Sequence, residues 1–317
     1  MSELISEIVD IAETERALYL LLVEYEQGDG GNGVGHVHRT DGHRNTVLEG
    51  VLSTNDTLRA MWVSPSGAIW LTSEGGNVWT SAGVQWPRPK DPDLDFKSYD
   101  AALRWNVTTL PNLEKEGYSP NLGVIWGTDD ANVFAAAFGG HIYYWNGKTW
   151  RQIYTAAGTI RAFSGTSAQN ILAVGENSTL LHFNGTTWRD LHNPDDSTDY
   201  HLFTGACYAS DGSVYICSQG GTVLHGSASG LTVLVQNDDI QLMGLVFLGD
   251  RLLFAAGSKG VAEFTNSTIV VIRSTFDAVF VKAGTRRSFF LEGASTETGY
   301  IEYDPENKKA PWWGITF

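Results

Sequence analysis

The sequence has few cysteines and no long apolar run. Cys207 and Cys217 are the only cysteines among 317 residues, and both lie in strand-like segments. We therefore expect two free core thiols, with no disulfide or metal pair. No apolar stretch approaches the roughly 20 residues that span a bilayer. Near the N-terminus, Glu3 and Glu7 stand where a secretory signal has basic residues. These features predict a cytoplasmic protein that does not bind membranes.

Basic residues are also few. The chain has 21 Lys and Arg against 36 Asp and Glu, which gives a formal net charge of −15 at pH 7. Such an excess repels nucleic acid and anionic lipid and attracts basic partners. An acidic balance can equally serve solubility alone. The chain is 42% hydrophobic and contains 35 glycines, enough apolar surface for a large core and enough glycine for many turns.

Two segments of the chain are copies of one another. Residues 122–153 read LGVIWGTDDANVFAAAFGGHIYYWNGKTWRQI, and residues 160–191 read IRAFSGTSAQNILAVGENSTLLHFNGTTWRDL, so they align without a gap. Each copy holds a continuous apolar run of the kind found in strands covered on both faces. Asn146-Gly147 and Asn184-Gly185 are expected to supply the positive φ angles of a tight hairpin. Each copy predicts four short antiparallel strands, the content of a propeller blade.

Weaker copies occupy the rest of the chain. The turn before the third strand recurs near seven positions: Gly35, Gly76, Gly140, Ser178, Gly221, Gly260 and Gly299. Most intervals are close to the ~40 residues of a four-stranded blade. The sequence therefore predicts an all-β, seven-bladed β-propeller of four-stranded antiparallel blades, in a single domain over 1–317. Residues 312–317 are expected either to form the outer strand of the last blade or to pair with the N-terminal strand.

One interval, from Gly76 to Gly140, is longer than the others by about two dozen residues. The extra residues form an insertion at about 85–120, which includes the segment Trp86-Pro87-Arg88-Pro89-Lys90. Long loops on a rigid scaffold often carry function. Trp86 and Trp105 lie outside the best repeats, so we expect them on a contact surface. Trp126, Trp145, Trp150 and Trp188 occupy repeat positions and are expected in the core.

The repeat resembles the tandem β-propeller repeats common in bacterial proteins. Their form is roughly (V/I)WG(T/S)xxx(N/D)V(W/F)AVGxxGxIxH(W/F/Y)NGxxW. The best match combines Ile125-Trp126-Gly127-Thr128, Asn132-Val133-Phe134-Ala135 and Tyr144-Trp145-Asn146-Gly147 with Trp150, whereas Ser164 stands where the pattern has Trp. The resemblance is specific over roughly 122 to 190 and loose elsewhere. It implies a fold and no particular activity, because such propellers serve as binding platforms, lectins and enzymes.

Motifs for chemistry are weak. The spacing of His36, His38 and His43 with Asp41 could hold zinc, but alternate histidines are common on exposed strands, and we expect no metal and no cofactor. The pairs Asp129-Asp130, Asp195-Asp196 and Asp238-Asp239 could serve a glycosidase. They fall in predicted turns, where aspartate commonly accepts backbone hydrogen bonds. We therefore expect no catalytic residue.

These patterns favour a non-enzymatic, protein-binding propeller. We expect a basic protein partner and no nucleic acid, with the chain monomeric when unbound. The more specific hypothesis is a bacterial antidote, or immunity-type protein, that neutralises a basic toxin or effector. A carbohydrate-binding or carbohydrate-hydrolysing propeller and an assembly factor or subunit of a larger complex are the alternatives. The candidate partner-binding residues are Trp86, Arg88, Lys90, Asp91, Asp93, Trp105, Asp129, Asp130 and Asp239.

Overall fold

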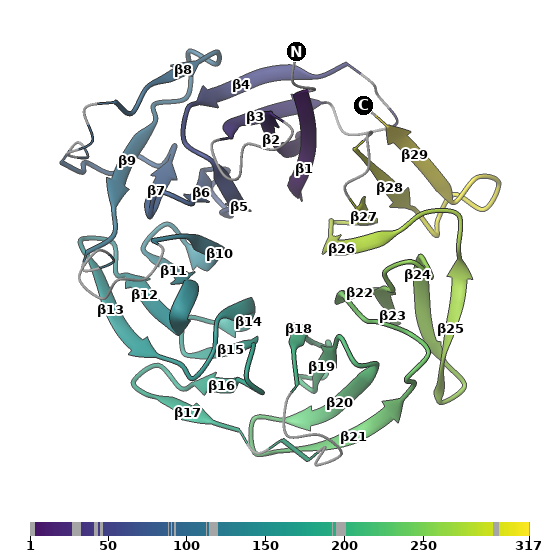
Figure 1. The fold of residues 1–317 in the computed structure, drawn as a ribbon. Helices are drawn as coiled ribbons and strands as arrows, with labels where there is room; N and C mark the ends of the chain where they lie inside the picture. The colour runs from purple at the N-terminus through teal and green to yellow at the C-terminus, as the bar shows by residue number, and fades with distance from the viewer. Residues whose placement is uncertain are drawn as a thin grey trace. The chain divides into compact units, whose positions relative to one another are not determined.

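The computed structural model confirms the predicted fold class, a seven-bladed β-propeller of four-stranded antiparallel sheets. It describes residues 4–26, 33–40, 44, 47–87, 89, 91, 93–111, 113, 120–191, 193–194, 201–293 and 298–316. Consecutive strands along the chain pair with one another in each sheet, as Figure 1 shows, except that β8 pairs with β4 and β9 with β7. The described chain divides into two compact units, Met1–Ile153 with Ala294–Tyr300 and Trp313–Phe317, and Tyr154–Gly293 with Ile301–Trp312.

The first three sheets belong to the first unit, apart from the last residues of β13. Their strand orders are β1-β2-β3-β4-β8, β5-β6-β7-β9 and β10-β11-β12-β13. The strands are β1 (Leu4–Glu13), β2 (Leu18–Glu26), β3 (Val34–Thr40), β4 (Glu49–Thr54), β5 (Leu58–Val63), β6 (Ile69–Ser73), β7 (Asn77–Thr80), β8 (Phe96–Ser98), β9 (Asn106–Thr109), β10 (Leu122–Asp129), β11 (Asn132–Ala137), β12 (His141–Trp145) and β13 (Trp150–Thr155). A 3-10 turn, η2 (Phe138–Gly140), connects β11 to β12.

The next three sheets belong to the second unit and each uses four consecutive strands. They are β14 (Ile160–Ser167), β15 (Asn170–Gly175), β16 (Leu180–Phe183) and β17 (Trp188–Asp190); β18 (Phe203–Tyr208), β19 (Val214–Ser218), β20 (Thr222–Ser227) and β21 (Gly230–Gln236); and β22 (Gly244–Leu248), β23 (Arg251–Ala255), β24 (Val261–Thr265) and β25 (Thr268–Arg273).

The seventh sheet has the order β26-β27-β28-β29, which shows that the C-terminal strand pairs with β28. Its strands are β26 (Ala278–Ala283), β27 (Ser288–Glu292), β28 (Gly299–Tyr303) and β29 (Trp312–Thr316). β29 is therefore the last strand of its own sheet, which is the first of the two arrangements expected from the sequence. β1 likewise pairs with β2 in the first sheet.

The repeated turn before the third strand has a common backbone cause. In the second to sixth sheets its landmark residues have positive φ angles: Gly76 (76°), Gly140 (82°), Ser178 (55°), Gly221 (84°) and Gly260 (87°). Glycine adopts such angles without steric cost, so its recurrence at this turn is explained by the backbone. The other two landmarks, Gly35 and Gly299, lie within β3 and β28 instead.

The Asn-Gly hairpins differ from expectation in one respect. Only the glycines have positive φ angles, 81° at Gly147 and 93° at Gly185. Asn146 instead accepts hydrogen bonds through its side-chain oxygen from the amides of Lys148 and Thr149, at 3.0 and 2.9 Å. The asparagine therefore stabilises a four-residue loop by side-chain capping, which is the other common role of this residue in turns.

Large aromatic and aliphatic side chains fill the core of each unit. Trp70, Trp79 and Phe134 are wholly buried in the first unit, and Phe254 and Phe290 in the second. Trp145 and Trp188 are buried, as the repeat predicts, whereas Trp126 and Trp150 are only partly buried. Wholly buried strands such as β6, which reads Ile-Trp-Leu-Thr-Ser, are apolar along most of their length.

Candidate partner-binding surface

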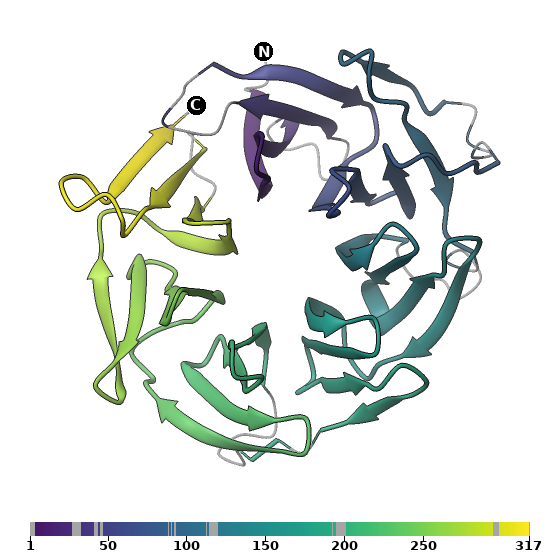
Figure 2. The same cartoon turned by 180° about the vertical axis from the view of Figure 1, so that it is seen from behind.

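The insertion forms a strand that joins the neighbouring sheet. β8 pairs antiparallel with β4, with Lys97 opposite Ser53, and thereby gives the first sheet a fifth strand. Figures 1 and 2 show β8 beside β4 at the edge of that sheet. The chain then returns through β9, which pairs with β7 as the last strand of the second sheet. The inserted residues up to 105 therefore lie between the third and fourth strands of the second sheet.

Polar groups at the end of β4 hold the start of β8. The Asn55 amide donates to the Asp95 carbonyl at 3.3 Å, and the Asp95 amide donates to the Asn55 side-chain oxygen at 2.9 Å. The Asn55 side-chain nitrogen donates to the Asp93 carbonyl at 2.7 Å. The Thr54 hydroxyl adds a hydrogen bond to the Asp95 carbonyl at 2.9 Å. The Asn55 side-chain amide, which has both a donor and an acceptor, thus bonds to the backbone of Asp93 and Asp95 on the two sides of residue 94.

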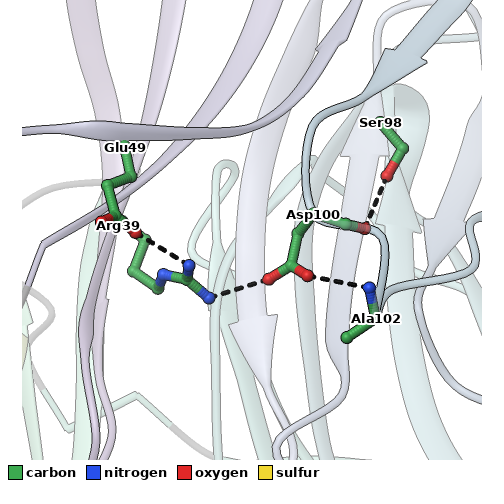
Figure 3. Close-up of polar contacts among 5 residues, drawn as sticks. All are labelled: Arg39, Glu49, Ser98, Asp100 and Ala102. Carbon is green, nitrogen blue, oxygen red and sulfur yellow. Dashed lines mark hydrogen bonds and ion pairs between the residues drawn. The ribbon is translucent and has the colours of Figure 1, made fainter.

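The other end of β8 is held by charge, as Figure 3 shows. The Arg39 guanidinium donates to Glu49 and to Asp100, each at 2.8 Å. Asp100 also accepts from the Ala102 amide at 2.9 Å, and the Ser98 hydroxyl donates to the Asp100 carbonyl at 3.1 Å. Arginine suits such bridging because its donors form a fixed planar fork. β3 and β4 are thereby tied to the turn that follows β8.

Aromatic side chains of β8 and its turn remain at the surface. Phe96 is 42% exposed and Tyr99 is 53% exposed. The Phe96 ring contacts Trp79 edge-on, with 5.3 Å between ring centroids. The Lys97 ammonium lies 4.5 Å from the centroid of the Tyr99 ring, a cation–π contact. The Tyr99 amide donates to the Val51 carbonyl at 3.0 Å, which extends the pairing with β4.

Trp86 belongs to a cluster of tryptophans and is partly buried. Its ring lies 5.8 Å from Trp70 and 5.4 Å from Trp145, both edge-on, and Trp150 contacts Trp70 and Trp145 on the same cluster. Edge-to-face packing of this kind is favourable between aromatic rings. The buried indole nitrogens of Trp86 and Trp150 have no hydrogen-bond partner among the described atoms. The ring of Trp86 thus covers the core, and its role in partner contact stays a prediction.

Asp130 and Asp129 have different roles near this cluster. Asp130 accepts from the Trp70 indole at 2.9 Å and from the Ser66 hydroxyl at 2.5 Å. Asp129 accepts from the Ala131 amide at 2.8 Å and from the Asn132 side chain at 3.0 and 2.9 Å. Partial burial acts to raise the pKa of Asp129, but these hydrogen bonds outweigh it and the pKa is lowered. Asp129 therefore shows the predicted turn chemistry, whereas Asp130 accepts hydrogen bonds from side chains of the neighbouring sheet instead.

The remaining candidate residues are dispersed. Trp105 packs partly buried against the core of the first two sheets, together with Leu94. Asp91 and Asp93 are exposed, and Asp91 accepts from the Asp93 amide at 2.9 Å. Asp239 is exposed in the second unit, and its amide donates to the Asn237 side chain at 3.1 Å. Arg88 and Lys90 lie outside the described residues.

The structure therefore joins only part of the predicted set. Trp86 and Asp130 both contact the Trp70 side chain. Asp91 and Asp93 lie just before β8, where the Asp93 carbonyl accepts a hydrogen bond from Asn55. The residues that position this surface, Arg39, Asn55 and Asp100, were not predicted. They lie up to about 60 residues apart along the chain, so neither periodicity nor a short motif could identify them.

The described residues of the possible zinc site, His36 and His38, do not make a complete ligand set. His36 and His38 lie on β3 with 6.0 Å between ring centroids, and Glu24 lies 3.4 Å from His36. Burial lowers the pKa of His38, and the neighbouring His36 adds to this effect. No group of three or more His, Cys, Asp or Glu side chains in the described part of the chain could hold a metal ion. Asp41 and His43 lie outside that part.

The two thiols are free, as expected. Cys217 is buried, and Cys207 is partly buried on the paired strand. Burial raises the pKa of Cys217 to about 12, and burial together with the proximity of Cys217 also raises the pKa of Cys207. Such thiols are poor nucleophiles at neutral pH. Among the described residues, no helix has the length and apolar character needed to cross a bilayer.

Comparison with known proteins identifies the fold. No protein-family model and no curated protein matches the chain. A structure described as YCF48 bound to D1 peptide is similar at 14% identity and TM-score 0.61, covering 98% of this chain and 97% of that one. YCF48 from Cyanidioschyzon merolae is 14% identical with TM-score 0.63 over 96% and 97%. The WD40 propeller domain of Doa1 is 9% identical with TM-score 0.63, covering 92% of each chain. At these identities the likeness shows the fold alone.

Proposed function

We propose that this propeller is a non-enzymatic binding protein for a basic protein partner, and specifically an antidote that neutralises a basic toxin or effector. The observation that carries the proposal is an inserted, polar-bonded segment that presents exposed aromatics at the edge of an acidic propeller. A rigid surface binds with little ordering cost. A net charge of −15 accelerates encounter with a basic protein.

Two further observations support the proposal. A structurally similar propeller has been solved with a bound peptide, so the fold can present a peptide-binding surface. The carboxylates of Asp129 and Asp130 accept hydrogen bonds from neighbouring side chains and amides, which favours a structural role over catalysis. Free Cys207 and Cys217 fit the reducing cytoplasm, where we place the protein.

The test is affinity capture from the lysate of the source organism, with the purified chain immobilised at low and at high salt. We expect one basic protein to be retained at about 50 mM salt and released at several hundred millimolar, because salt screens exposed charges. Retention of no protein would contradict the binding function. A partner that stays bound in stoichiometric amounts at high salt would instead indicate a subunit of a permanent complex.

The antidote role needs a second experiment. The captured partner is expressed alone and together with this chain in the same host. We expect expression alone to arrest growth and co-expression to restore it. A partner that is harmless when expressed alone would contradict the antidote role while leaving the binding function in place.

A further inference from the structure

β8 has one edge with which none of the described strands pairs. It is the last strand in the order β1-β2-β3-β4-β8, so only its inner edge is paired. The Asp95 carbonyl and the Tyr99 amide bond to β4, so the peptide groups of Lys97, which lies between them opposite Ser53, also face β4. Backbone groups alternate between the two edges of a strand in an antiparallel ladder, so the peptide groups of Phe96 and Ser98 point away from β4. The Phe96 amide is occupied by the Asp95 carboxylate at 2.9 Å. The open edge thus presents the Ser98 N–H and the carbonyls of both residues.

This edge is held in place although β8 buries little. All three of its residues are exposed. Ordering a segment costs conformational entropy, which apolar burial usually offsets. Here hydrogen bonds from Asn55 and Thr54 at one end, and from Arg39 to Asp100 at the other, fix the segment. A preorganised strand edge is suited to pairing with an extended segment, because the ordering cost on this side is already met.

The charge beside the open edge determines which segment fits. Asp91, Asp93 and Asp95 precede β8 at alternate positions and are all exposed. At the opposite end of β4, the Glu49 side chain is 64% exposed. A strand added to the open edge of β8 would continue past these aspartates. Basic residues in that strand would meet opposite charge, while acidic ones would be repelled.

We propose that an extended basic segment of the partner adds to the open edge of β8 as a further strand. Main-chain hydrogen bonds to Phe96 and Ser98 provide the pairing, and Lys or Arg side chains lie against Asp91, Asp93 and Asp95. The exposed ring of Phe96 lies on the opposite face of the strand and contacts the side chains that alternate with the basic ones. This inference rests on the proposed function, since it names the docking surface for the basic partner.

The test uses a fluorescein-labelled octapeptide of alternating Lys and Val, with binding measured by fluorescence anisotropy. The control peptide has the same sequence with every backbone amide N-methylated, so it keeps the charge and cannot pair as a strand. We expect the first peptide to bind and the second to bind at least tenfold more weakly. Equal binding of both peptides, or binding of neither, would overturn the inference.

Variants of the chain locate the site. Ser98→Pro removes the outward N–H at a position where an edge strand tolerates proline, and Ser98→Ala keeps it. We expect Ser98→Pro to raise Kd about tenfold and Ser98→Ala to change it less than twofold. The double variant Asp91→Asn/Asp93→Asn is matched by Asp211→Asn/Asp250→Asn, which changes the net charge equally at two exposed positions of the second unit. Only the first pair is expected to raise Kd, by about fivefold. Equal effects of the two pairs would show nonspecific attraction and overturn the inference.

Hydrogen exchange of the unaltered chain provides a readout that does not depend on how the variants fold. With the Lys-Val octapeptide bound, exchange is expected to slow several-fold in residues 94–103, and absence of protection there would overturn the inference. Capture of the partner from lysate distinguishes failure of this inference from failure of the proposed function. Capture of a basic protein equally by the unaltered chain and by Ser98→Pro would leave the proposed function standing and refute docking on β8.

Discussion

Asp56 shows how a single carboxylate can organise the inside of a sheet. It is 7% exposed and accepts two hydrogen bonds, from the Asn77 side chain and the Trp79 indole, each at 2.9 Å. Charge-assisted hydrogen bonds of this kind are stronger than neutral ones. The carboxylate therefore joins the loop before β5 to β7, and it satisfies two buried donors that would otherwise be unpaired.

Replacing Asp56 should destabilise the protein. Asp56→Ala leaves the Asn77 and Trp79 donors without an acceptor, and we expect the free energy of unfolding to fall by about 2–4 kcal/mol, since each unsatisfied buried donor costs about 1–3 kcal/mol. Urea unfolding followed by tryptophan fluorescence measures this. Asp211→Ala is the control, because Asp211 only accepts bonds from Ser213 in an exposed turn. Equal stability of both variants would contradict the assigned role of Asp56.

The two thiols should be inert in the folded protein. Burial raises the pKa of Cys217 to about 12 and raises that of Cys207 as well, so neither is a thiolate at pH 8. We expect Ellman's reagent to react with neither cysteine in native buffer and with both in 6 M guanidinium. Rapid modification of either thiol in the native protein would show that Cys207 or Cys217 is accessible to solvent, contrary to its burial in β18 and β19.

At the scale of elements, the ion pairs of Arg39 hold the turn after β8 rather than the fold. The arginine lies between Glu49 and Asp100, and its side chain is 34% exposed. Solvent screens such pairs, so the contribution to global stability is small, under about 1 kcal/mol. Its effect on the local opening of β8 is a separate quantity, because exposed segments open independently of the core.

Removal of this arginine should loosen β8 selectively. For Arg39→Ala we expect several-fold faster hydrogen exchange in residues 95–103 and a change of less than about 1 kcal/mol in the free energy of unfolding. Arg161→Ala removes a comparable exposed ion pair, with Glu176, in the second unit. That control should leave exchange in residues 95–103 unchanged. Unaltered exchange in Arg39→Ala would mean that the hydrogen bonds of Asn55 suffice alone.

The elements that the sequence predicts well are those with a repeated local cause. The strands β11 and β15 are continuous apolar runs, and the turns before the third strands need a residue at positive φ, commonly glycine. Both signals recur along the chain, which is why the number of blades could be predicted. The C-terminal strand left two pairings open, because strand partners depend on long-range packing that no local pattern encodes.

β8 marks the limit of sequence interpretation. Phe96-Lys97-Ser98 is three residues long, has no apolar alternation and pairs with a strand about 40 residues earlier. The insertion could be located from the repeat interval, but its attachment to β4 could not. Trp86 illustrates the same limit: its place outside the repeat suggested a surface, and the structure packs its ring partly buried against Trp70 and Trp145.

On the scale of the whole molecule, charge and fold give complementary information. The propeller fold is compatible with many activities, whereas a net charge of −15 favours the proposed basic partner over an acidic one. Acidic side chains on the surface raise the rate of encounter with a basic protein, and this contribution falls as salt screens the charges. The affinity for the partner should therefore depend on ionic strength.

The most direct measurement is calorimetric titration of the purified partner into the purified chain at about 50 and 300 mM NaCl. We predict one binding site and a Kd that rises at least tenfold at the higher salt, because screening weakens attraction between exposed charges. An affinity that does not change with salt would contradict an electrostatic mode of recognition. Absence of binding at both salt concentrations would contradict the proposal that this propeller binds a basic protein.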